Sequence, residues 1–565
     1  MVLVDGRLDD RPQLLDLLEP RGSSATFLSD GQLLALAWQR WREDTLDRVS
    51  GDFVLACWDR DERSLTLVRS PNSPRALLIA ERPGGVSFAS TAQALLGRPG
   101  GDRSLDLNEL AGVMVGDAHR DGRTMFRGVR LLRQGTLWRW SEGQSRSRDL
   151  WCSVTDRLPQ VSASSAAEEL REHVERAVAS CVRRPGGPLA SQLSAGRDSS
   201  AVTATAASLL AQSGERLLAV TGAPRARGVL EAYGDRLTDE SQLAAATAAF
   251  HPNIDHVVTR GFAPESIADQ LDNIHHEAIA PVPNPSALTW WTRNTSAAFG
   301  AGAEVLLTGE AGNLTLSAGG PISLIDILRS RGPMAFMRSL LKVGDGDIGQ
   351  WRTALKISAG AVLPAAVYRN LVRFARGRPR TEGISFLRPP LRQAAAAHAR
   401  RFADEWKPGR TLVEHRVAAF QFREPNDRLF REGRLLQIRD PSADWRLIRL
   451  CLALPAELLV SRHDRRPLYE AAFKSLLPGA VLTNRKRGYQ GADWFTLFTR
   501  QSVEHALARY RNSAAVQEYL DLDALDRAVA EWPSTGWHRP DVVEIYRYEM
   551  GTALAVASFL ALYFD

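Results

Sequence analysis

The sequence contains little cysteine, only four residues in a chain of 565. These cysteines are far apart and form no CxxC pair, so they predict neither a zinc site nor a disulfide framework; they are Cys57, Cys152, Cys181 and Cys451. This usage fits a reducing compartment, and we expect a cytoplasmic protein. We expect no signal peptide, because charged residues follow Met1 within a few positions.

Long apolar runs are also missing. The longest, from Gly551 to Phe564, is too short to cross a bilayer, so it predicts a buried terminal helix and no membrane partner. Neither sign of charge is in large excess, because 71 Lys and Arg face 65 Asp and Glu. That balance favours a solvated arginine-rich surface over a nucleic-acid partner, with an anionic ligand such as a nucleotide as the next choice.

The patterning of the chain changes near residue 155, after which a polar linker reaches about residue 165. Before that point, short β-like runs separated by turns predict packed antiparallel sheets; the runs are 52–58, 64–69, 76–80 and 135–140. After it, helices alternate with apolar strands, which predicts a parallel α/β sheet covered on both faces. The expected helices are 166–182, 199–210 and 239–250, and the expected strands are 188–193, 217–221 and 304–308. Beyond about residue 322 the chain is mostly helical, with a basic surface segment at 369–380.

One loop of small residues carries the strongest chemical signal. Residues 194–200 (Ser-Ala-Gly-Arg-Asp-Ser-Ser) lie between a predicted strand and a predicted helix, where unpaired N–H groups and the positive end of the helix dipole suit a phosphate. Gly196 permits a tight turn, and hydroxyls come from Ser194, Ser199 and Ser200. Asp198 would repel a bare phosphate, so its expected role is to bind a Mg²⁺ ion that bridges phosphate oxygens. The loop lacks the Walker A pattern, and an ordinary helix cap is the alternative.

This loop resembles the S-x-G-x-D-S-S loop of the asparagine-synthetase-like family of ATP pyrophosphatases, and the resemblance extends over nearly the whole chain. Enzymes of that family adenylate a carboxylate, release pyrophosphate and pass the acyl group to an amine. The resemblance implies ATP and Mg²⁺ as cofactors. The ATP-binding residues that it implies around the loop and the second strand are Leu193, Ser194, Gly196, Arg197, Asp198, Ser199, Ser200 and Thr221.

Residues 308–313 (Thr-Gly-Glu-Ala-Gly-Asn) resemble the family's second nucleotide segment, T-G-x-G-x-D. By that match Thr308 and Gly309 border the nucleotide, and Glu310 sits at the catalytic edge. Asn313 stands where many members place a second Mg²⁺ ligand. An amide oxygen is a weaker ligand than a carboxylate, so direct coordination by Asn313 stays open. Without the resemblance, the segment would predict only a turn that ends a strand.

Two later segments resemble those of lasso peptide cyclases, the branch of the family that closes an isopeptide ring in a precursor peptide. Residues 439–446 (Arg-Asp-Pro-Ser-Ala-Asp-Trp-Arg) open a helix, with helix capping as the alternative role. Residues 484–494 join a basic cluster to glycines, and a solvated basic turn is the alternative there. By comparison with the β-lactam-forming members, Lys486 takes the place of their catalytic lysine, with Arg487 and Arg485 as rivals.

The same resemblance implies a set of substrate-binding residues in these segments and in the stretch 284–291. They are Asn284, Trp290, Arg439, Asp440, Ser442, Asp444, Gln490 and Asp493. For the stretch 284–291, the start of a helix with core tryptophans is an equal alternative. His275 and His276 lack a partnering motif, and we expect both on a helix surface.

The N-terminal part resembles the family's glutaminase-like N-terminal nucleophile domain in the segments 5–11, 51–59 and 87–91. True glutaminases expose a cysteine directly after the initiator methionine, where this chain has Val2 and begins inside the family pattern. We therefore expect a structural domain that supplies no ammonia.

Together these observations predict an α/β protein of two domains. The resemblance implies that residues 1–155 form a degenerate Ntn-hydrolase-like αββα domain without catalysis. It implies that residues 156–565 form a PP-loop (adenine-nucleotide α-hydrolase-like) parallel α/β synthetase domain with a helical C-terminal part. The expected reaction is macrolactam formation, which joins an Asp or Glu side chain of a precursor (core) peptide to the peptide's N-terminal amine. A leader peptidase and a leader-recognition protein are the expected further partners. The alternatives are a synthetase for a small molecule, an RNA-modifying ATP pyrophosphatase and a non-catalytic scaffold.

Overall fold

The structure is a computed structural model, and it describes most of the chain. The described ranges are 1–18, 28–98, 101–115, 122–155, 159–183, 186–225, 236–262, 265–282, 284–344, 385–405, 411–421, 436–460 and 466–565, with isolated positions between 356 and 367. The predicted basic segment 369–380 lies outside the described residues.

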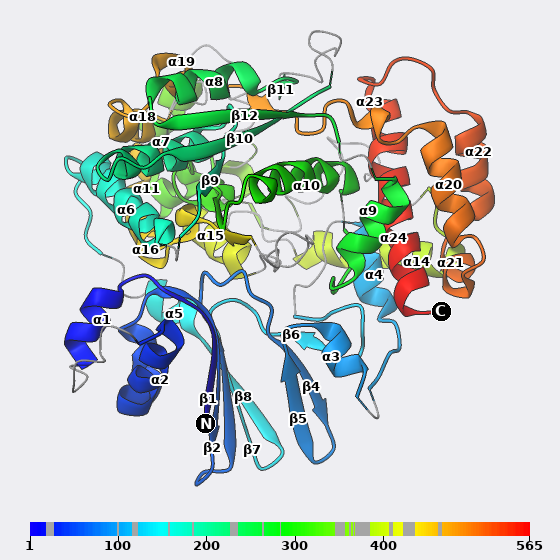
Figure 1. The fold of residues 1–565 in the computed structure, drawn as a ribbon, viewed down its shortest axis with the longest axis horizontal. Helices are drawn as coiled ribbons and strands as arrows, with labels where there is room; N and C mark the ends of the chain where they lie inside the picture. The colour runs from blue at the N-terminus through cyan, green and yellow to red at the C-terminus, as the bar shows by residue number, and fades with distance from the viewer. Residues whose placement is uncertain are drawn as a thin grey trace.

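The N-terminal part contains two antiparallel sheets, drawn in blue and cyan at the bottom of Figure 1. The larger sheet has the order β1 (Val2–Leu8), β2 (Gly51–Asp59), β3 (Ser64–Arg69), β7 (Thr136–Ser141) and β8 (Gln144–Asp149). The smaller has the order β5 (Gly85–Ala89), β4 (Leu78–Arg82) and β6 (Arg130–Leu131). All four predicted β runs are therefore confirmed as strands.

These two sheets form the middle layers of an α-β-β-α arrangement. Alternate residues of a strand point to opposite faces, so β2 and β3 can bury apolar side chains on both sides. Leu67, Ile79 and Trp138 pack between the sheets. Leu55 packs on the other face against helix α2 (Asp30–Trp41), next to α1 (Arg11–Leu18). The short helix α3 (Ala92–Leu96) lies against the smaller sheet.

The second part is built on a five-stranded sheet in which every neighbouring pair is parallel. Its order is β12 (Ile254–Arg260), β10 (Leu217–Ala223), β9 (Leu189–Gln192), β13 (Val305–Leu307) and β14 (Gln437–Arg439). Three of these strands match the expected ones, whereas β12 and β14 were not predicted. Leu307 of β13 pairs with Ser191 of β9, so the loops that follow these two strands emerge side by side.

Helices cover both faces of this sheet, as the alternating pattern predicted. Leu189 and Leu307 pack on one face, and Ala190 and Leu306 pack on the other against α10. The helices around the sheet are α6 (Ala166–Val182), α7 (Arg197–Ala211), α8 (Ser241–Phe250), α10 (Pro285–Gly300), α16 (Trp445–Ala453), α17 (Ala456–Leu459), α18 (Pro467–Phe473) and α19 (Gly479–Leu482). The prediction of α6 is confirmed at both ends, and those of α7 and α8 are confirmed to within two residues.

The C-terminal half is mostly helical. Besides α11 (Ser323–Gly344), it contains α14 (Pro389–Glu405), α15 (Leu412–Gln421), α20 (Arg500–Tyr510), α21 (Ala514–Tyr519), α22 (Leu522–Ala530), α23 (Pro540–Val542) and α24 (Met550–Tyr563). Helix α24, red in Figure 1, is buried all round and packs against α20, α21 and α9 (Ile267–His275), which confirms the expected terminal helix. Within the described part of the chain, no helix combines the length and the apolar character that crossing a membrane requires.

The two parts share a continuous core. Phe126 of the N-terminal part stacks on Phe564 with ring centroids 5.4 Å apart, and it also contacts Phe559 of α24. Helix α4 (Leu107–Met114) packs against α14 across the same boundary. Polar contacts join the opposite side, where Arg446 pairs with Asp10.

The prediction for His275 was wrong, because its side chain is fully buried. Its Nδ1 lies 2.9 Å from the Ser558 hydroxyl of α24, and its Nε2 accepts a hydrogen bond of 3.2 Å from the Val282 amide. Burial lowers the pKa of His275 to about 3, so the imidazole is neutral in the fold. His276, in contrast, is exposed as expected. Two adjacent histidines at the end of a helix point to different sides, and the sequence pair alone hides that difference.

Candidate functional site

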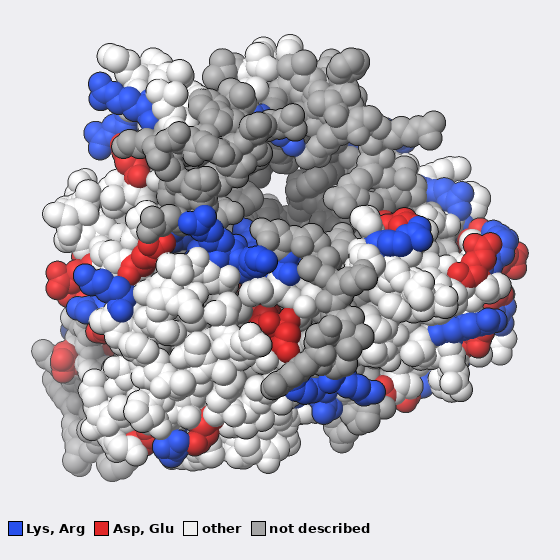
Figure 2. Space-filling view, turned by 90° about the horizontal axis from the view of Figure 1, so that it is seen from above, with Lys and Arg blue, Asp and Glu red and all other residues white. Residues whose placement is uncertain are grey.

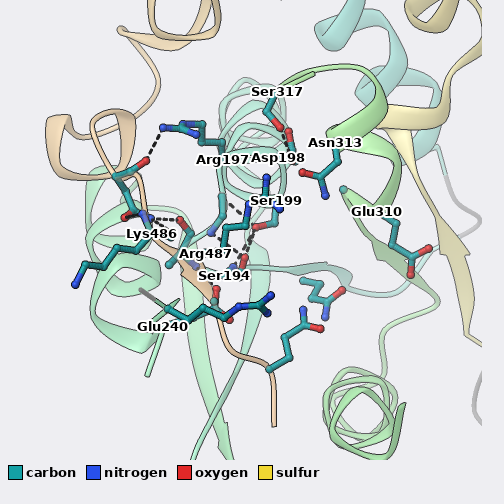
Figure 3. A pocket seen from close by; sticks show the side chains of 18 of the residues that line it. Ser194, Arg197, Asp198, Ser199, Glu240, Glu310, Asn313, Ser317, Lys486 and Arg487 are labelled. Atoms are coloured by element: carbon teal, nitrogen blue, oxygen red, sulfur yellow. Dashed lines mark hydrogen bonds between the residues drawn. The ribbon is translucent and has the colours of Figure 1, made fainter. Parts of the chain in front are cut away.

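A cavity of about 880 Å³ lies at the carboxyl ends of β9 and β13 (Figure 3). In open parallel sheets, this is where ligands usually bind. The predicted site residues that line it are Ser194, Gly196, Arg197, Asp198, Ser199, Asn284, Gly309, Glu310, Asn313, Lys486, Arg487 and Gln490. Seen from above, several Lys and Arg side chains gather near the middle of the molecular surface (Figure 2). The basic character of this face suits an anionic ligand.

Residues 194–200, the serine loop, are held in shape by hydrogen bonds of their own hydroxyls. Ser199 Oγ accepts a hydrogen bond of 3.2 Å from the Ser194 amide and lies 2.8 Å from Ser194 Oγ. Ser194 Oγ in turn accepts a bond of 3.0 Å from the Gly196 amide. Gly196 is the cap residue of α7 and has no side chain, and the serine hydroxyls accept hydrogen bonds from amides within the loop itself. The loop therefore presents the start of α7 to the cavity in a fixed geometry.

Asp198 is the buried carboxylate of this site, with 9% of its surface exposed. Its Oδ2 accepts a hydrogen bond of 2.9 Å from the Ser317 hydroxyl, and its Oδ1 has no hydrogen-bond partner among the described residues. Burial raises the pKa of Asp198 to about 7, an effect that Ser317 and the Arg197 cation partly offset. A buried oxygen with no partner among the described residues, at the start of a helix, fits a bound cation.

The residues present fit Mg²⁺ held jointly with phosphates. Within the described ranges, no three acidic, histidine or cysteine side chains gather into a metal-binding cluster. Mg²⁺ bound with a nucleotide needs only one or two carboxylates, because phosphates and water supply the rest. In Figure 3 the Asn313 side chain lies beside Asp198, whereas Glu310 extends away from it. Asp198 would thus provide the carboxylate, and metal binding by Asn313 stays a prediction.

Two glycines allow the segment 308–313 to pack closely against the serine loop. A Cβ atom on Gly312 would lie 2.2 Å from the Asp198 Cβ, and one on Gly309 would lie 2.9 Å from the Asp198 carbonyl carbon. Neither position can carry a side chain without displacing Asp198. Gly312 was not among the predicted site residues, although the spacing of the two glycines in the segment 308–313 was the available signal.

Asp440 reaches this segment from the other side. Its Oδ2 accepts a hydrogen bond of 2.9 Å from the Ala311 amide, and its Oδ1 accepts one of 3.0 Å from the Ser442 amide. Thr315 donates a bond of 2.9 Å to the Ser442 carbonyl. The short helix η5 (Pro441–Ala443) thereby braces the turn η3 (Glu310–Leu314).

The remaining residues of the segment 439–446 also have structural contacts and do not line the cavity. Buried Arg439 donates a hydrogen bond of 2.6 Å to the Cys181 carbonyl. Asp444 is the N-cap of α16, where it accepts a hydrogen bond of 2.9 Å from the Arg446 amide. Helix capping, the alternative interpretation of this segment, therefore describes its geometry.

The basic segment 484–494 is joined to the serine loop by hydrogen bonds. Arg197 donates a hydrogen bond of 2.6 Å to the Asn484 carbonyl, and Asn484 donates one of 3.1 Å to the Ala195 carbonyl. Strand β15 (Arg487–Gly488) then pairs with β11 (Arg236–Leu237). The cations of this segment, Arg485, Lys486 and Arg487, all line the cavity. The Lys486 side chain extends away from Asp198 in Figure 3.

Glu240 is a buried carboxylate that the sequence analysis missed. It lines the cavity, and its Oε1 accepts a hydrogen bond of 3.2 Å from the Ala195 amide of the serine loop. A Cβ atom on Gly488 would lie 2.1 Å from the Glu240 carboxyl carbon, so β15 passes directly over this carboxylate. Burial raises the pKa of Glu240 to about 7. In the sequence, Glu240 was one of two adjacent acidic residues at the start of the predicted helix 239–250 and belonged to no motif.

Several other residues line the cavity without having been predicted. Ser317 contacts Asp198, and Arg466 donates a hydrogen bond of 2.9 Å to the Ser317 carbonyl. Further residues of this kind include Gln192, Arg236, Val282, Ala287, Trp291 and Ala318. Ala287 and Trp291 lie in the stretch 284–291 that the resemblance marked, whereas the others belong to no segment singled out from the sequence.

Other predicted residues lie behind the cavity wall. Trp290 is buried, and its indole fills the space above Gly222 of β10, while Trp291 is the tryptophan that lines the cavity. Asp493 is buried as well, and it accepts a hydrogen bond of 2.9 Å from the Arg225 amide. The other predicted residues that are buried and do not line the cavity are Leu193, Ser200, Thr221 and Thr308. For these residues, direct contact with a ligand has no support from the geometry.

Comparison with known families agrees with this site. The Asparagine synthase family matches residues 169–553, and the Glutamine amidotransferase domain matches residues 2–151. The first match covers more than half of the chain. The chain belongs to the asparagine synthase family.

Individual relatives are more distant. Asparagine synthetase [glutamine-hydrolyzing] 3 of Bacillus subtilis is 24% identical over 290 residues, which are 49% of this chain and 42% of that protein. A putative asparagine synthetase [glutamine-hydrolyzing] of Mycobacterium tuberculosis is 29% identical over 143 residues, 25% of this chain and 22% of that protein. The chain thus matches less than half the length of these curated relatives. Assignment to the peptide-cyclase branch stays a prediction.

The solved structures that match this chain include a distant one. Glutamine phosphoribosylpyrophosphate amidotransferase from B. subtilis, complexed with ADP and GMP, shares 13% sequence identity at a TM-score of 0.18. The match covers 39% of this chain and 54% of that one. A score this low supports no conclusion about the present chain.

Proposed function

We propose that this chain uses ATP to activate a carboxylate and joins the resulting acyl group to an amine, with release of AMP and pyrophosphate. The observation that carries the proposal is the Asp198 carboxylate, buried at the start of α7, whose Oδ1 has no partner among the described residues. A helix start binds phosphate groups, and a carboxylate placed there needs a bridging cation. Mg²⁺ at Asp198 would neutralise phosphate charge as the pyrophosphate leaves.

The proposed chemistry has two steps. First, a carboxylate oxygen attacks the α-phosphorus of ATP, the bond from that phosphorus to the bridging oxygen breaks, and pyrophosphate leaves. Second, the amine nitrogen attacks the acyl carbon, AMP leaves with the carboxylate oxygen, and the amine loses a proton. The serine loop would bind the pyrophosphate through the Ser194–Ser199 region, and the cations of the segment 484–487 would stabilise charge in both steps.

We further propose that the substrate is a peptide that the enzyme closes into a macrolactam. The half of the cavity beyond the serine loop is lined by amide groups from Asn284 and Gln490 and by apolar Val282, Ala287 and Trp291. Amide and apolar groups suit a peptide chain, and the motifs at 439–446 and 484–494 resemble those of peptide cyclases. Held in one pocket, the two ends of a peptide react at a high effective concentration. In this proposal, a leader-recognition protein and a leader peptidase act on the precursor peptide first. Removal of the leader frees the N-terminal amine that closes the ring.

A synthetase for a small molecule is the second candidate, and the names of the curated relatives favour it. Both relatives are called asparagine synthetases. Such an enzyme would convert free aspartate and an ammonia donor, and a peptide would not compete. The two candidates share the ATP chemistry and differ in what fills the amide-lined half of the cavity.

Mass spectrometry separates the two candidates. The enzyme is incubated with Mg·ATP and synthetic peptides that carry a free N-terminal amine and a single Asp or Glu. The peptide proposal predicts a product lighter by one water, formed together with AMP. Acetylation of the N-terminus should block ring closure, and replacement of the Asp or Glu by its amide should block both products. If aspartate with glutamine or ammonia yields asparagine while every peptide stays unchanged, the peptide proposal is wrong.

A further inference from the structure

Arg547 connects two segments of the chain, a first one at 284–291 and a second one at 488–494. They contribute Asn284 and Gln490 to the amide-lined half of the cavity. Arg547 lies in a π-helical turn, η7 (Val543–Glu549), directly before α24, and only 2% of its surface is exposed. No sequence motif pointed to this residue. Single π-helical turns are rare and are often found at functional sites.

The guanidinium group bonds to both segments at once. Its Nε donates a hydrogen bond of 3.1 Å to the Ser286 hydroxyl, and its Nη2 donates one of 2.7 Å to the Gln490 carbonyl. The same group lies over the Tyr489 ring, 4.4 Å from the ring centroid. A guanidinium is planar and presents its donors in a rigid fork, so the two bonds set the separation of the two segments.

On the first segment, the contact passes directly to a residue of the cavity wall. Ser286 donates a hydrogen bond of 2.9 Å to the Asn284 Oδ1, and that oxygen also accepts a bond of 3.3 Å from the Ala287 amide at the start of α10. Both Asn284 and Ala287 line the cavity. Arg547 therefore fixes the Asn284 amide through a single intervening hydroxyl.

On the second segment, the backbone conformation depends on the same corner. Gly491 follows Gln490 and has a φ of 62°, in the left-handed region that favours glycine. A Cβ atom there would lie 3.2 Å from the Ser286 carbonyl and 3.6 Å from Nη2 of Arg547. The turn at Gly491 thus packs against the first segment, and Gln490 is held at the cavity by its own carbonyl.

We propose that Arg547 is a positioning residue that shapes the amide-lined half of the cavity by fixing Asn284 and Gln490 relative to each other. That this half binds the substrate rests on the proposed function, but the positioning itself does not depend on which substrate binds. The nucleotide half, with Asp198 and the serine loop, has no contact with Arg547 in any hydrogen bond described above. Loss of Arg547 should therefore affect the two halves unequally.

Hydrogen–deuterium exchange measured by mass spectrometry tests this without a substrate. In Arg547→Met, amide exchange should become at least about tenfold faster in residues 284–291 and 488–494, as expected when a hydrogen bond to a charged group is lost. Exchange in residues 189–200 and 305–313 should stay unchanged. The affinity for Mg²⁺ with α,β-methylene-ATP, a non-cleavable analogue, should stay within about twofold of wild type, a change well below one tenfold step.

Three further variants keep the test decisive. Arg547→Lys keeps the charge but not the fork, so it should show an intermediate effect in both segments. Ser286→Ala removes only one contact, and its faster exchange should be confined to 284–291. Arg539→Met, an exposed arginine of the preceding turn that pairs with Asp541, is the matched control and should change neither segment.

Two results would overturn the proposal. One is unchanged exchange at both segments in Arg547→Met and Ser286→Ala. The other is a parallel loss of analogue affinity and of protection throughout the chain, which would assign Arg547 to general stability. For any substrate that yields product, the proposal also predicts a KM for that substrate raised about tenfold, with the KM for ATP unchanged. Failure to find a substrate would count against the proposed function only, because the exchange data need none.

Discussion

Ser317 donates a hydrogen bond of 2.9 Å to one oxygen of Asp198, while the other oxygen of that carboxylate has no partner among the described residues. The hydroxyl fixes the orientation of the carboxylate, and in the proposed function the remaining oxygen binds a cation. This arrangement accounts for a carboxylate beside the loop that is proposed to bind phosphate. It also implies a cost in stability when no cation is bound.

Asp198→Asn should stabilise the metal-free protein while abolishing AMP release. The pKa of Asp198 is about 7 in the fold against an ordinary value of 3.8, so the folded state binds more protons between those pH values. Stability therefore falls as pH rises from about 4 to 7, and the amide variant lacks this loss. Thermal unfolding without Mg²⁺ should show a higher Tm for the variant at pH 8 and little difference at pH 4. The gain at pH 8 corresponds to up to a few kcal/mol in the free energy of unfolding. A lower Tm at pH 8 would contradict this assignment of the carboxylate.

Gly312→Ala should reduce AMP release by about a hundredfold or more, because the added Cβ would lie 2.2 Å from that of Asp198 and must displace it. A matched control is Gly479→Ala, where the structure places no atom within 4 Å of the added carbon. Steady-state rates of both variants, normalised for folded protein by circular dichroism, provide the comparison. Full activity of Gly312→Ala would show that the segment 308–313 does not press on Asp198.

Glu240 offers a test of how the serine loop is held. Glu240→Gln can still accept the hydrogen bond from the Ala195 amide, whereas Glu240→Ala leaves that amide without its partner. We expect the affinity for Mg²⁺ with α,β-methylene-ATP to stay near wild type in Glu240→Gln and to fall about tenfold in Glu240→Ala. Isothermal titration calorimetry measures both. Equal losses in the two variants would mean that the charge of Glu240, and not its hydrogen bond, is what the loop needs.

Because His275 is buried against α24, we expect the C-terminal helical part to be sensitive to acid. Its pKa of about 3 in the fold lies below the ordinary 6.5, so the unfolded state binds the proton between these values. Stability is then complete above about pH 6.5 and falls with decreasing pH, by about 3 kcal/mol near pH 4. Urea unfolding at a series of pH values should show this slope in wild type and a shallower one in His275→Gln. An identical slope in both proteins would place the acid-sensitive group elsewhere.

The sequence predicted the parts of the fold that depend on local patterning. Helix α6 was found because Leu170, Val174 and Val178 repeat on one face, and the four N-terminal strands were found because Gly, Pro and Asp separate them. The strands β12 and β14 escaped prediction. β14 has only three residues and takes its place by pairing with β13, a long-range contact that no local pattern records.

The candidate site was predicted where a motif recorded it. Residues 194–200 and 309–313 do come together, because β9 and β13 are neighbours in a parallel sheet. Glu240, Ser317 and Arg547 were missed, since each reaches its partner from a distant part of the chain. Arg439 and Asp444 show the converse, because their motif marked buried structural contacts that sequence alone cannot tell from ligand contacts.

Chromatography of the nucleotide products tests the central claim most directly. Wild-type protein with Mg·ATP and a competent carboxylate substrate should release AMP and pyrophosphate in equal amounts, and Asp198→Ala should release neither. Formation of ADP and phosphate, or undiminished AMP release by Asp198→Ala, would contradict the account.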